Sequence, residues 1–139
     1  MRYLIIVKAT ADSEAGRMPE ESRFAEMASY NESLAQAGVL LDGSGLQPSS
    51  KGFRVQYSGG KRCIVDGPFA EAKELVAGYT LIQVRSEEEA REWARRFPNP
   101  SGEGQDGEIE VRRLFELEDF EQGPAIERFR ELDMQQKRG

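Results

Sequence analysis

One acidic residue at the end of an apolar run is the strongest candidate for chemistry in this sequence. Residues 62–65 read RCIV, which is typical of a strand, and Asp66 follows them directly, before the corner Gly67-Pro68. Binding and catalytic groups often lie on loops that a rigid scaffold holds. Two roles are open for the Asp66 carboxylate. It acts as a general base facing a cleft, or it accepts N–H groups of residues 67–70 and so caps the corner.

The residue types present restrict the chemistry further. The chain has no histidine and one cysteine, which excludes Ser-His-Asp and Cys-His sites, Cys/His zinc sites and an internal disulfide. Acid–base work therefore depends on Asp, Glu, Lys or Tyr. No loop has calcium-ligand spacing, and the glycines at 43 and 45 lack the third glycine of a dinucleotide site. We expect neither a metal site nor a cofactor.

Three further side chains are candidates for ligand binding. Lys73 follows the corner and either holds an anionic ligand near Asp66 or belongs to a solvated face. Tyr79 lies on an expected strand, in the core or in a cleft. Arg112 either clamps a carboxylate through two parallel hydrogen bonds or pairs with Glu110.

The neighbours of Asp66 are expected to have structural roles. Gly67 and Pro68 would fix the corner, through backbone freedom and a locked φ respectively. We expect Phe69 to be a core residue rather than a platform for a substrate, and Cys63 to be a small core residue.

Composition indicates one globular domain with a highly charged surface. The chain has 139 residues and a formal net charge of −6. Nucleic-acid binding is not expected, because the arginines at 91, 95 and 96 alternate with glutamates instead of forming a basic patch. The apolar run at 3–7 is too short for a signal peptide or a membrane span, so we expect a cytoplasmic protein that does not bind membranes.

Apolar periodicity and turn signals predict the order of elements. The expected elements are a strand at 2–9, a helix at 19–37, a strand from 39, a hairpin turning at 59–60, a helical turn at 69–74, a strand at 75–84, a helix from the Ser86 cap to Pro98, a strand at 109–117 and a terminal helix after Gly123-Pro124 that points Ile126, Phe129 and Leu132 inward.

This order predicts an α+β ferredoxin-like fold, an antiparallel sheet with helices on one face, plus an extra hairpin and a C-terminal helix. Residues 2–9 and 75–84 are apolar on both faces, although the helices cover only one. A second copy of the chain, packed sheet against sheet, would bury the other face. We therefore expect a homodimer.

Several motifs, in order, resemble the DGPF branch of the YCII-related family. They are the start MRYLII, AGVL at 37–40, GLQP at 45–48, DGPFAEAKE at 66–74, GY at 78–79 and EVR at 110–112. The resemblance implies a dimeric α/β barrel with a cleft near the Asp66 loop. It assigns residues 1–118 to this domain and leaves 119–139 as a C-terminal helical extension.

The chain departs from the family pattern in two places. Ala72 stands where the motif usually has threonine, so a hydroxyl role there is absent. Shorter members carry a His–Asp pair, and that mechanism does not transfer to a chain without histidine. The DGPF branch is also associated with sigma factors of the extracytoplasmic-function type, which implies a regulatory partner.

Three hypotheses of function follow. The first is a small-molecule-binding or cofactor-free enzyme-like dimer, with Asp66 as acid–base and Lys73 and Arg112 holding an anion. The second is a regulatory protein that acts with a sigma factor, and an exposed apolar patch on the terminal helix would favour it. The third is a dimeric binding module without catalysis.

Overall fold

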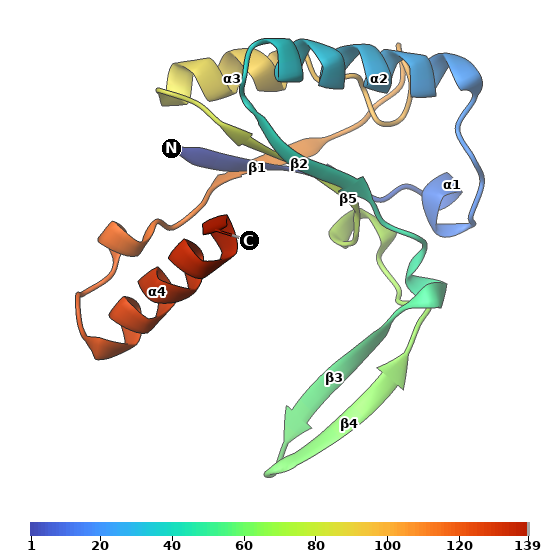
Figure 1. Ribbon diagram of the computed structural model, residues 1–139. Coiled ribbons are helices and arrows are strands. Elements are labelled where there is room, and N and C mark those ends of the chain that lie inside the picture. The colour runs from blue at the N-terminus through green and yellow to red at the C-terminus, as the bar shows by residue number, and fades with distance from the viewer. Residues whose placement is uncertain (139) are drawn as a thin grey trace.

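A four-stranded antiparallel sheet in the order β2-β5-β1-β6 forms the centre of the protein (Figure 1). We describe residues 1–138 from a computed structural model. The strands of this sheet are β1 (Arg2–Lys8), β2 (Leu40–Gly45), β5 (Val76–Gln83) and β6 (Ile109–Arg113). The helices are α1 (Ala11–Glu14), α2 (Glu21–Gln36), α3 (Glu87–Arg95) and α4 (Pro124–Arg138). A separate two-stranded hairpin consists of β3 (Phe53–Ser58) and β4 (Lys61–Asp66).

The helices α2 and α3 cover one face of the sheet (Figure 1). Strand order and antiparallel pairing confirm the predicted α+β, ferredoxin-like plan. The short 3₁₀ turns η1 (Ser49–Lys51), η2 (Ala72–Glu74) and η3 (Leu117–Asp119) lie in the connections.

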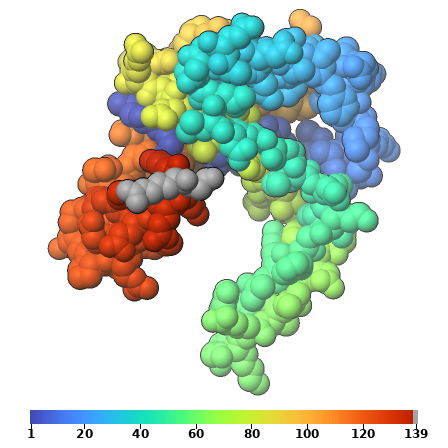
Figure 2. All heavy atoms as spheres, in the orientation of Figure 1, coloured from blue at the N-terminus to red at the C-terminus, as the bar shows by residue number. Residues whose placement is uncertain are grey.

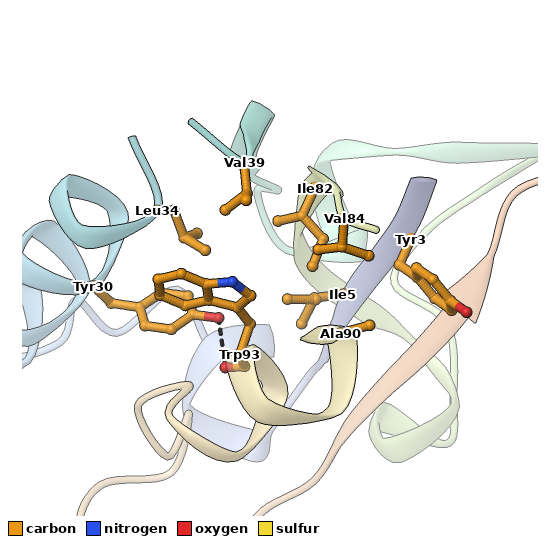
Figure 3. Close-up of a cluster of buried hydrophobic side chains, with 9 residues drawn as sticks. All are labelled: Tyr3, Ile5, Tyr30, Leu34, Val39, Ile82, Val84, Ala90 and Trp93. Carbon is orange, nitrogen blue, oxygen red and sulfur yellow. Dashed lines mark hydrogen bonds between the residues drawn. The ribbon is translucent and has the colours of Figure 1, made fainter. Parts of the chain in front are cut away.

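Side-chain alternation in β1 defines the core. Tyr3 and Ile5 are buried against the helices, whereas Leu4 and Ile6, which point the other way, are only half-buried. Trp93 of α3 lies in the same core and packs edge-on against Tyr30 of α2, with ring centroids 6.2 Å apart (Figure 3). The helix phase that the sequence predicts for Trp93 is therefore confirmed.

On the opposite face of the sheet, which we call the open face, the described residues place no helix flat against the strands. Two projections leave the sheet on this side, the β3–β4 hairpin at one end and α4 at the other (Figure 1). Figure 2 shows the wide recess between them. Within one chain, the open face is the floor of this recess.

The structure corrects several expectations. No helix was expected between the strand at 2–9 and the helix at 19–37, but Ala11–Glu14 form a helical turn that the Thr10 and Ser13 side chains cap. The last strand ends at Arg113 rather than at 117. Cys63 is exposed, because the hairpin has no core of its own to bury it.

The terminal helix forms as predicted, but its apolar side chains do not point into a core. Phe129 is 57 % exposed and Leu132 is 53 % exposed, because α4 extends away from the sheet. No helix among the described residues is long and apolar enough to cross a membrane.

Candidate functional site

The corner after Asp66 is held by the segment around Ser49. The N–H of Gly67 donates to the carbonyl oxygen of Gly52 at 3.0 Å, and the N–H of Phe69 donates to Oγ of Ser49 at 3.0 Å. The N–H of Ser49 in turn donates to Oε1 of Glu14 at 2.9 Å. Glu14 and Ser49 thus tie the corner to α1, which explains why this irregular segment has one defined course.

Gly67 occupies a position that has no room for a side chain. A Cβ built on Gly67 would overlap the carbonyl oxygen and carbon of Ser49. The peptide bond between Gly67 and Pro68 is cis. The structural roles expected for these two residues are consistent with this close approach of two backbone segments.

The Asp66 carboxylate does not cap the corner. Two of the amides that were expected to bind it donate elsewhere, since the N–H of Gly67 donates to Gly52 and that of Phe69 donates to Ser49. Asp66 is the last residue of β4, is paired across the ladder with Phe53, and is exposed. Of the two roles that the sequence left open, the capping role is therefore wrong, and the acid–base role stays a prediction.

The corner leads into the central sheet beside the end of β1. The N–H of Ala9 donates to the carbonyl oxygen of Leu75 at 2.9 Å, which joins the residue after β1 to the residue before β5. Lys73 lies in the exposed turn η2 directly before this junction. Glu71, which precedes η2, has a left-handed backbone with φ of 61°.

Phe69 is half-buried, which is less than a core position requires. The guanidinium carbon of Arg54 lies 3.8 Å from the centroid of its ring, a cation–π contact. The ring therefore packs the base of the hairpin onto the corner instead of entering the main core.

Tyr79 lies on the open face, where it forms a hydrogen bond that the sequence did not predict. Its hydroxyl donates to Oδ2 of Asp42, on the neighbouring strand β2, at 3.0 Å. Asp42 is opposite Leu81 and Tyr79 is opposite Ser44 in the β2–β5 ladder, so the two side chains are diagonal neighbours on one face.

Arg112 lies on the same open face, on the other side of β1. Its Nη1 is 3.4 Å from Oε2 of Glu110, the ion pair that was one of the two expectations for it. Nζ of Lys8 is 3.4 Å from Oε1 of the same carboxylate. Glu110 thus bridges two cations, and the cluster Lys8–Glu110–Arg112 has a net charge of +1.

The ladder register shows how these groups are arranged. Ile6 of β1 is opposite Tyr79 on one side and Glu110 on the other, and Leu4 is opposite Leu81 and Arg112. The Tyr79–Asp42 pair and the cationic cluster therefore flank an apolar floor. Of the four residues singled out from the sequence, Tyr79 and Arg112 share this face. Asp66 and Lys73 instead lie on the segment that joins β4 to β5 and that meets the sheet beside the C-terminal end of β1.

The charges of the cluster affect the ionisation of Glu110. The hydrogen bond from Arg112, followed by that from Lys8, holds the pKa of the Glu110 carboxyl below its usual value. Glu110 therefore remains an anion to lower pH than an isolated glutamate, and it keeps both cations in place on the sheet.

Sequence reasoning missed Asp42 and Lys8 as members of the site, and it named Glu110 only as a partner of Arg112. Strand alternation could have placed Lys8 and Glu110 on one face with Arg112, given the correct strand order. Asp42 gave no such signal, because a bulge shifts the β2–β5 register between Leu40 and Asp42.

Two open hollows lie away from these residues. One of about 310 Å³ lies between α3 and the β1–β6 edge, lined by Tyr3, Arg91 and Arg95 among others, and one of about 170 Å³ lies beside Phe97 and Ile109. Neither touches Asp66, Lys73, Tyr79 or Arg112. The cleft expected beside Asp66 stays a prediction.

Comparison with known proteins places this architecture in a family. The chain is 32 % identical over 95 residues to an uncharacterised protein of Rhizobium meliloti, and the match covers 68 % of this chain and 75 % of that protein. It also has a fold likeness to 5-chloro-2-hydroxyhydroquinone dehydrochlorinase from Burkholderia phenoliruptrix in complex with 2,5-dihydroxybenzoquinone, with a TM-score of 0.42, 15 % identity, and coverage of 83 % of this chain and 94 % of that one. That likeness is too distant to carry an argument about activity. The YCII-related domain family matches residues 1–118, so this chain belongs to the YCII-related family.

Proposed function

We propose that the protein is a homodimer that binds a small organic anion on the open face of its sheet, beside the Asp66 loop, without a cofactor. The observation that carries the proposal is the arrangement on the open face. An apolar floor formed by Leu4, Ile6 and Leu81 separates the Tyr79–Asp42 pair from the Lys8–Glu110–Arg112 cluster.

The cationic cluster supplies the affinity for an anion. Lys8 and Arg112 share one carboxylate, so a ligand carboxylate or phenolate can take up the donors that Glu110 leaves unused. Arg112 is the more accessible of the two cations, with a side chain 71 % exposed against 22 % for Lys8. Lys73, in the exposed turn beside the corner, adds a third cation at the β1 end.

The polar groups opposite the cluster suit a ligand that also carries hydroxyl groups. The Tyr79 hydroxyl donates to Asp42, so its own oxygen is still able to accept a hydrogen bond. The side chain of Asp66 is exposed and serves as the acid–base group if the ligand is converted. The proposal has two versions. In one the protein converts the bound ligand, and in the other it only binds the ligand, as a dimeric binding module does.

The open recess provides a site only when something closes it. Leu4, Ile6 and Leu81 are half-buried. Within residues 1–138, no helix packs flat on the face that carries them (Figure 1). A second copy that packs its own open face here would exclude water and strengthen every polar interaction in the site. Dimerisation and binding are therefore parts of one proposal.

The test combines oligomeric state with ligand binding. Sedimentation equilibrium at micromolar concentration gives the mass of the assembly, and a dimer is expected. A panel of small aromatic and aliphatic carboxylates and phenols is then titrated by calorimetry. Because a hydrogen bond to a charged group is worth about 1.5–3 kcal/mol, Arg112→Gln should weaken binding roughly tenfold or more.

A matched control separates the site from general surface charge. Arg91 on α3 is also an exposed, ion-paired arginine, but it lies on the helix side of the sheet. Arg91→Gln should leave the affinity unchanged. Equal affinity of Arg112→Gln and wild type, or absence of binding across the whole panel, would overturn the proposal.

One observation favours a second candidate, a regulatory protein that acts with an extracytoplasmic-function sigma factor. The apolar side chains of α4, among them Phe129 and Leu132, are exposed and offer a docking surface. If the sigma factor binds to α4, Phe129→Ser should abolish binding of the sigma factor and leave the mass of the homodimer unchanged.

A further inference from the structure

The exposed apolar side chains are concentrated on two segments that project from the open face. We call the first the hairpin (residues 53–66) and the second the C-terminal arm (residues 115–138). Among the described residues, nine of the fifteen exposed large apolar side chains lie on these segments. On the hairpin they are Phe53, Val55, Tyr57 and Ile64, and on the arm they are Phe115, Phe120, Phe129, Leu132 and Met134.

The hairpin is amphipathic, and its apolar face is left exposed by the part of the chain that the structure describes. Val55 is directly opposite Ile64, and Phe53 and Tyr57 lie on the same side by strand alternation. Gln56 and Cys63 face the other way. The two strands pair only with each other, and an isolated two-stranded sheet is marginally stable in water. The apolar face therefore needs a covering surface for the hairpin to be stable.

The two segments have opposite charge. The hairpin carries Arg54, Lys61 and Arg62 against one acid, Asp66, a net charge of +2. The C-terminal arm carries seven acidic and four basic residues, a net charge of −3. Contact between a hairpin and an arm is thus electrostatically favourable, whereas contact between two hairpins brings like charges together.

Their positions allow this contact only between two chains. The hairpin and the arm lie at opposite ends of the sheet, separated by the recess (Figures 1 and 2). Consider a two-fold axis that runs between two facing sheets, parallel to both, and at right angles to the line joining the two segments. Rotation about this axis turns the open face of the second copy toward that of the first and exchanges the two ends of the sheet. Each hairpin then comes to the end of the sheet that carries the partner's arm.

From these observations we infer that, in the homodimer, the apolar face of each hairpin packs on the C-terminal arm of the other copy. The inference rests on the proposed homodimer and adds which surfaces meet. Each recess is then bounded at one end by its own Asp66 corner and at the other end by the hairpin of the partner subunit. The ligand site is incomplete without this exchange of hairpins.

Disulfide trapping tests the arrangement, because a disulfide forms only when two Cα atoms approach within about 7 Å. Cys63 is the only cysteine, so a Cys63→Ser background is free of thiols. Ile64→Cys places a thiol on the apolar face of the hairpin, and Leu132→Cys places one on α4. With both substitutions in one chain, mild oxidation should yield a species of doubled mass on a non-reducing gel.

The single variants and a matched control identify the contact. Ile64→Cys alone and Leu132→Cys alone, each with Cys63→Ser, should stay single chains. Leu132→Cys with the natural Cys63 retained should link much less, because Cys63 lies on the opposite face of the hairpin from Ile64. Sedimentation of the reduced variants verifies that each still forms the assembly of the wild type.

Each other outcome overturns the inference. Doubled mass with Ile64→Cys alone would show that the hairpins meet each other. A link within one chain would show that the hairpin folds onto its own arm. A dimer that never links would show that the dimer uses other surfaces, so that the proposed dimer survives and the exchange does not. A single-chain mass in sedimentation would overturn the dimer itself.

Discussion

The hydroxyl of Tyr30 donates a hydrogen bond to the backbone carbonyl of Trp93 at 2.8 Å, and so joins α2 to α3 over the sheet (Figure 3). Tyr30→Phe removes this bond and keeps the ring. The Trp93 carbonyl still accepts the N–H of Arg96 at 3.2 Å. We therefore expect the free energy of unfolding to fall by only about 1 kcal/mol, measured by urea denaturation. A loss several times larger would show that the carbonyl is left without a partner.

The same tyrosine predicts a dependence of stability on alkaline pH. Burial raises the pKa of Tyr30 to about 12 from an ordinary value of 10.0. Above the unfolded-state pKa, the unfolded chain loses this proton before the folded chain does. The stability that Tyr30 contributes is thus fully present below about pH 10 and is lost as pH rises toward 12.

The measurement compares wild type with Tyr30→Phe in urea at neutral and alkaline pH. The difference between the two proteins isolates Tyr30 from the other groups that titrate there. Wild type should lose more stability than Tyr30→Phe between the two conditions. Parallel losses would contradict the predicted effect.

Trp93 should be among the most costly side chains to truncate. It is 7 % exposed and packs against Tyr30, and the guanidinium carbon of Arg96 lies 4.0 Å from its ring centroid. We expect Trp93→Ala to lower the free energy of unfolding by roughly 3–5 kcal/mol. Glu92→Ala, at the exposed neighbouring position of the same helix, is the control and should change stability by less than about 0.5 kcal/mol.

Gly67→Ala should destabilise the corner that follows Asp66. The new Cβ would collide with backbone atoms of Ser49, and a backbone segment cannot move aside as the end of a flexible side chain can. We expect a loss of roughly 1–3 kcal/mol, or more, in denaturation experiments. Gly45→Ala is the matched control, because nothing lies within 4 Å of a Cβ there. Similar stability of the two variants would contradict the prediction, because it would show that the backbone around Gly67 and Ser49 can shift at little cost in free energy.

Substitution of Asp66 separates its binding role from a structural one. Because the corner amides are satisfied by Gly52 and Ser49, both Asp66→Ala and Asp66→Asn should retain stability within about 0.5 kcal/mol. Turnover of any ligand that the panel identifies should be lost in both. If Asp66→Asn acts on the ligand as wild type does, Asp66 has no acid–base role.

The central sheet and its helices were predictable because they follow simple periodicities. Alternation in β1 and the cap formed by Ser86 for α3 depend on residues close together in sequence, and both are confirmed. The α1 turn was missed, since its caps Thr10 and Ser13 lie in a polar, glycine-containing stretch that also suits a loop.

The candidate site was predictable only in part. Arg112 and Tyr79 were found from their strand positions, but the partners Asp42 and Lys8 come from strands whose neighbours the sequence alone does not reveal. The capping role of Asp66 failed because competing acceptors, Ser49 and Gly52, lie well before it in the chain. The inward side of α4 was also wrong, since an apolar stripe predicts burial without saying which chain supplies the cover.

The position of β1 has a consequence for how the chain is made. The strand β1 leaves the ribosome before β5 and β6, yet it lies between them in the sheet, where Arg2 is paired with Gln83 of β5 and Tyr3 with Arg113 of β6. The apolar residues of β1 therefore remain unpaired until β5 and β6 have been synthesised. Such long-range pairing makes folding slow and exposes the nascent chain to aggregation. Chaperone supply and translation rate should accordingly govern the soluble yield of this protein more than its final stability does.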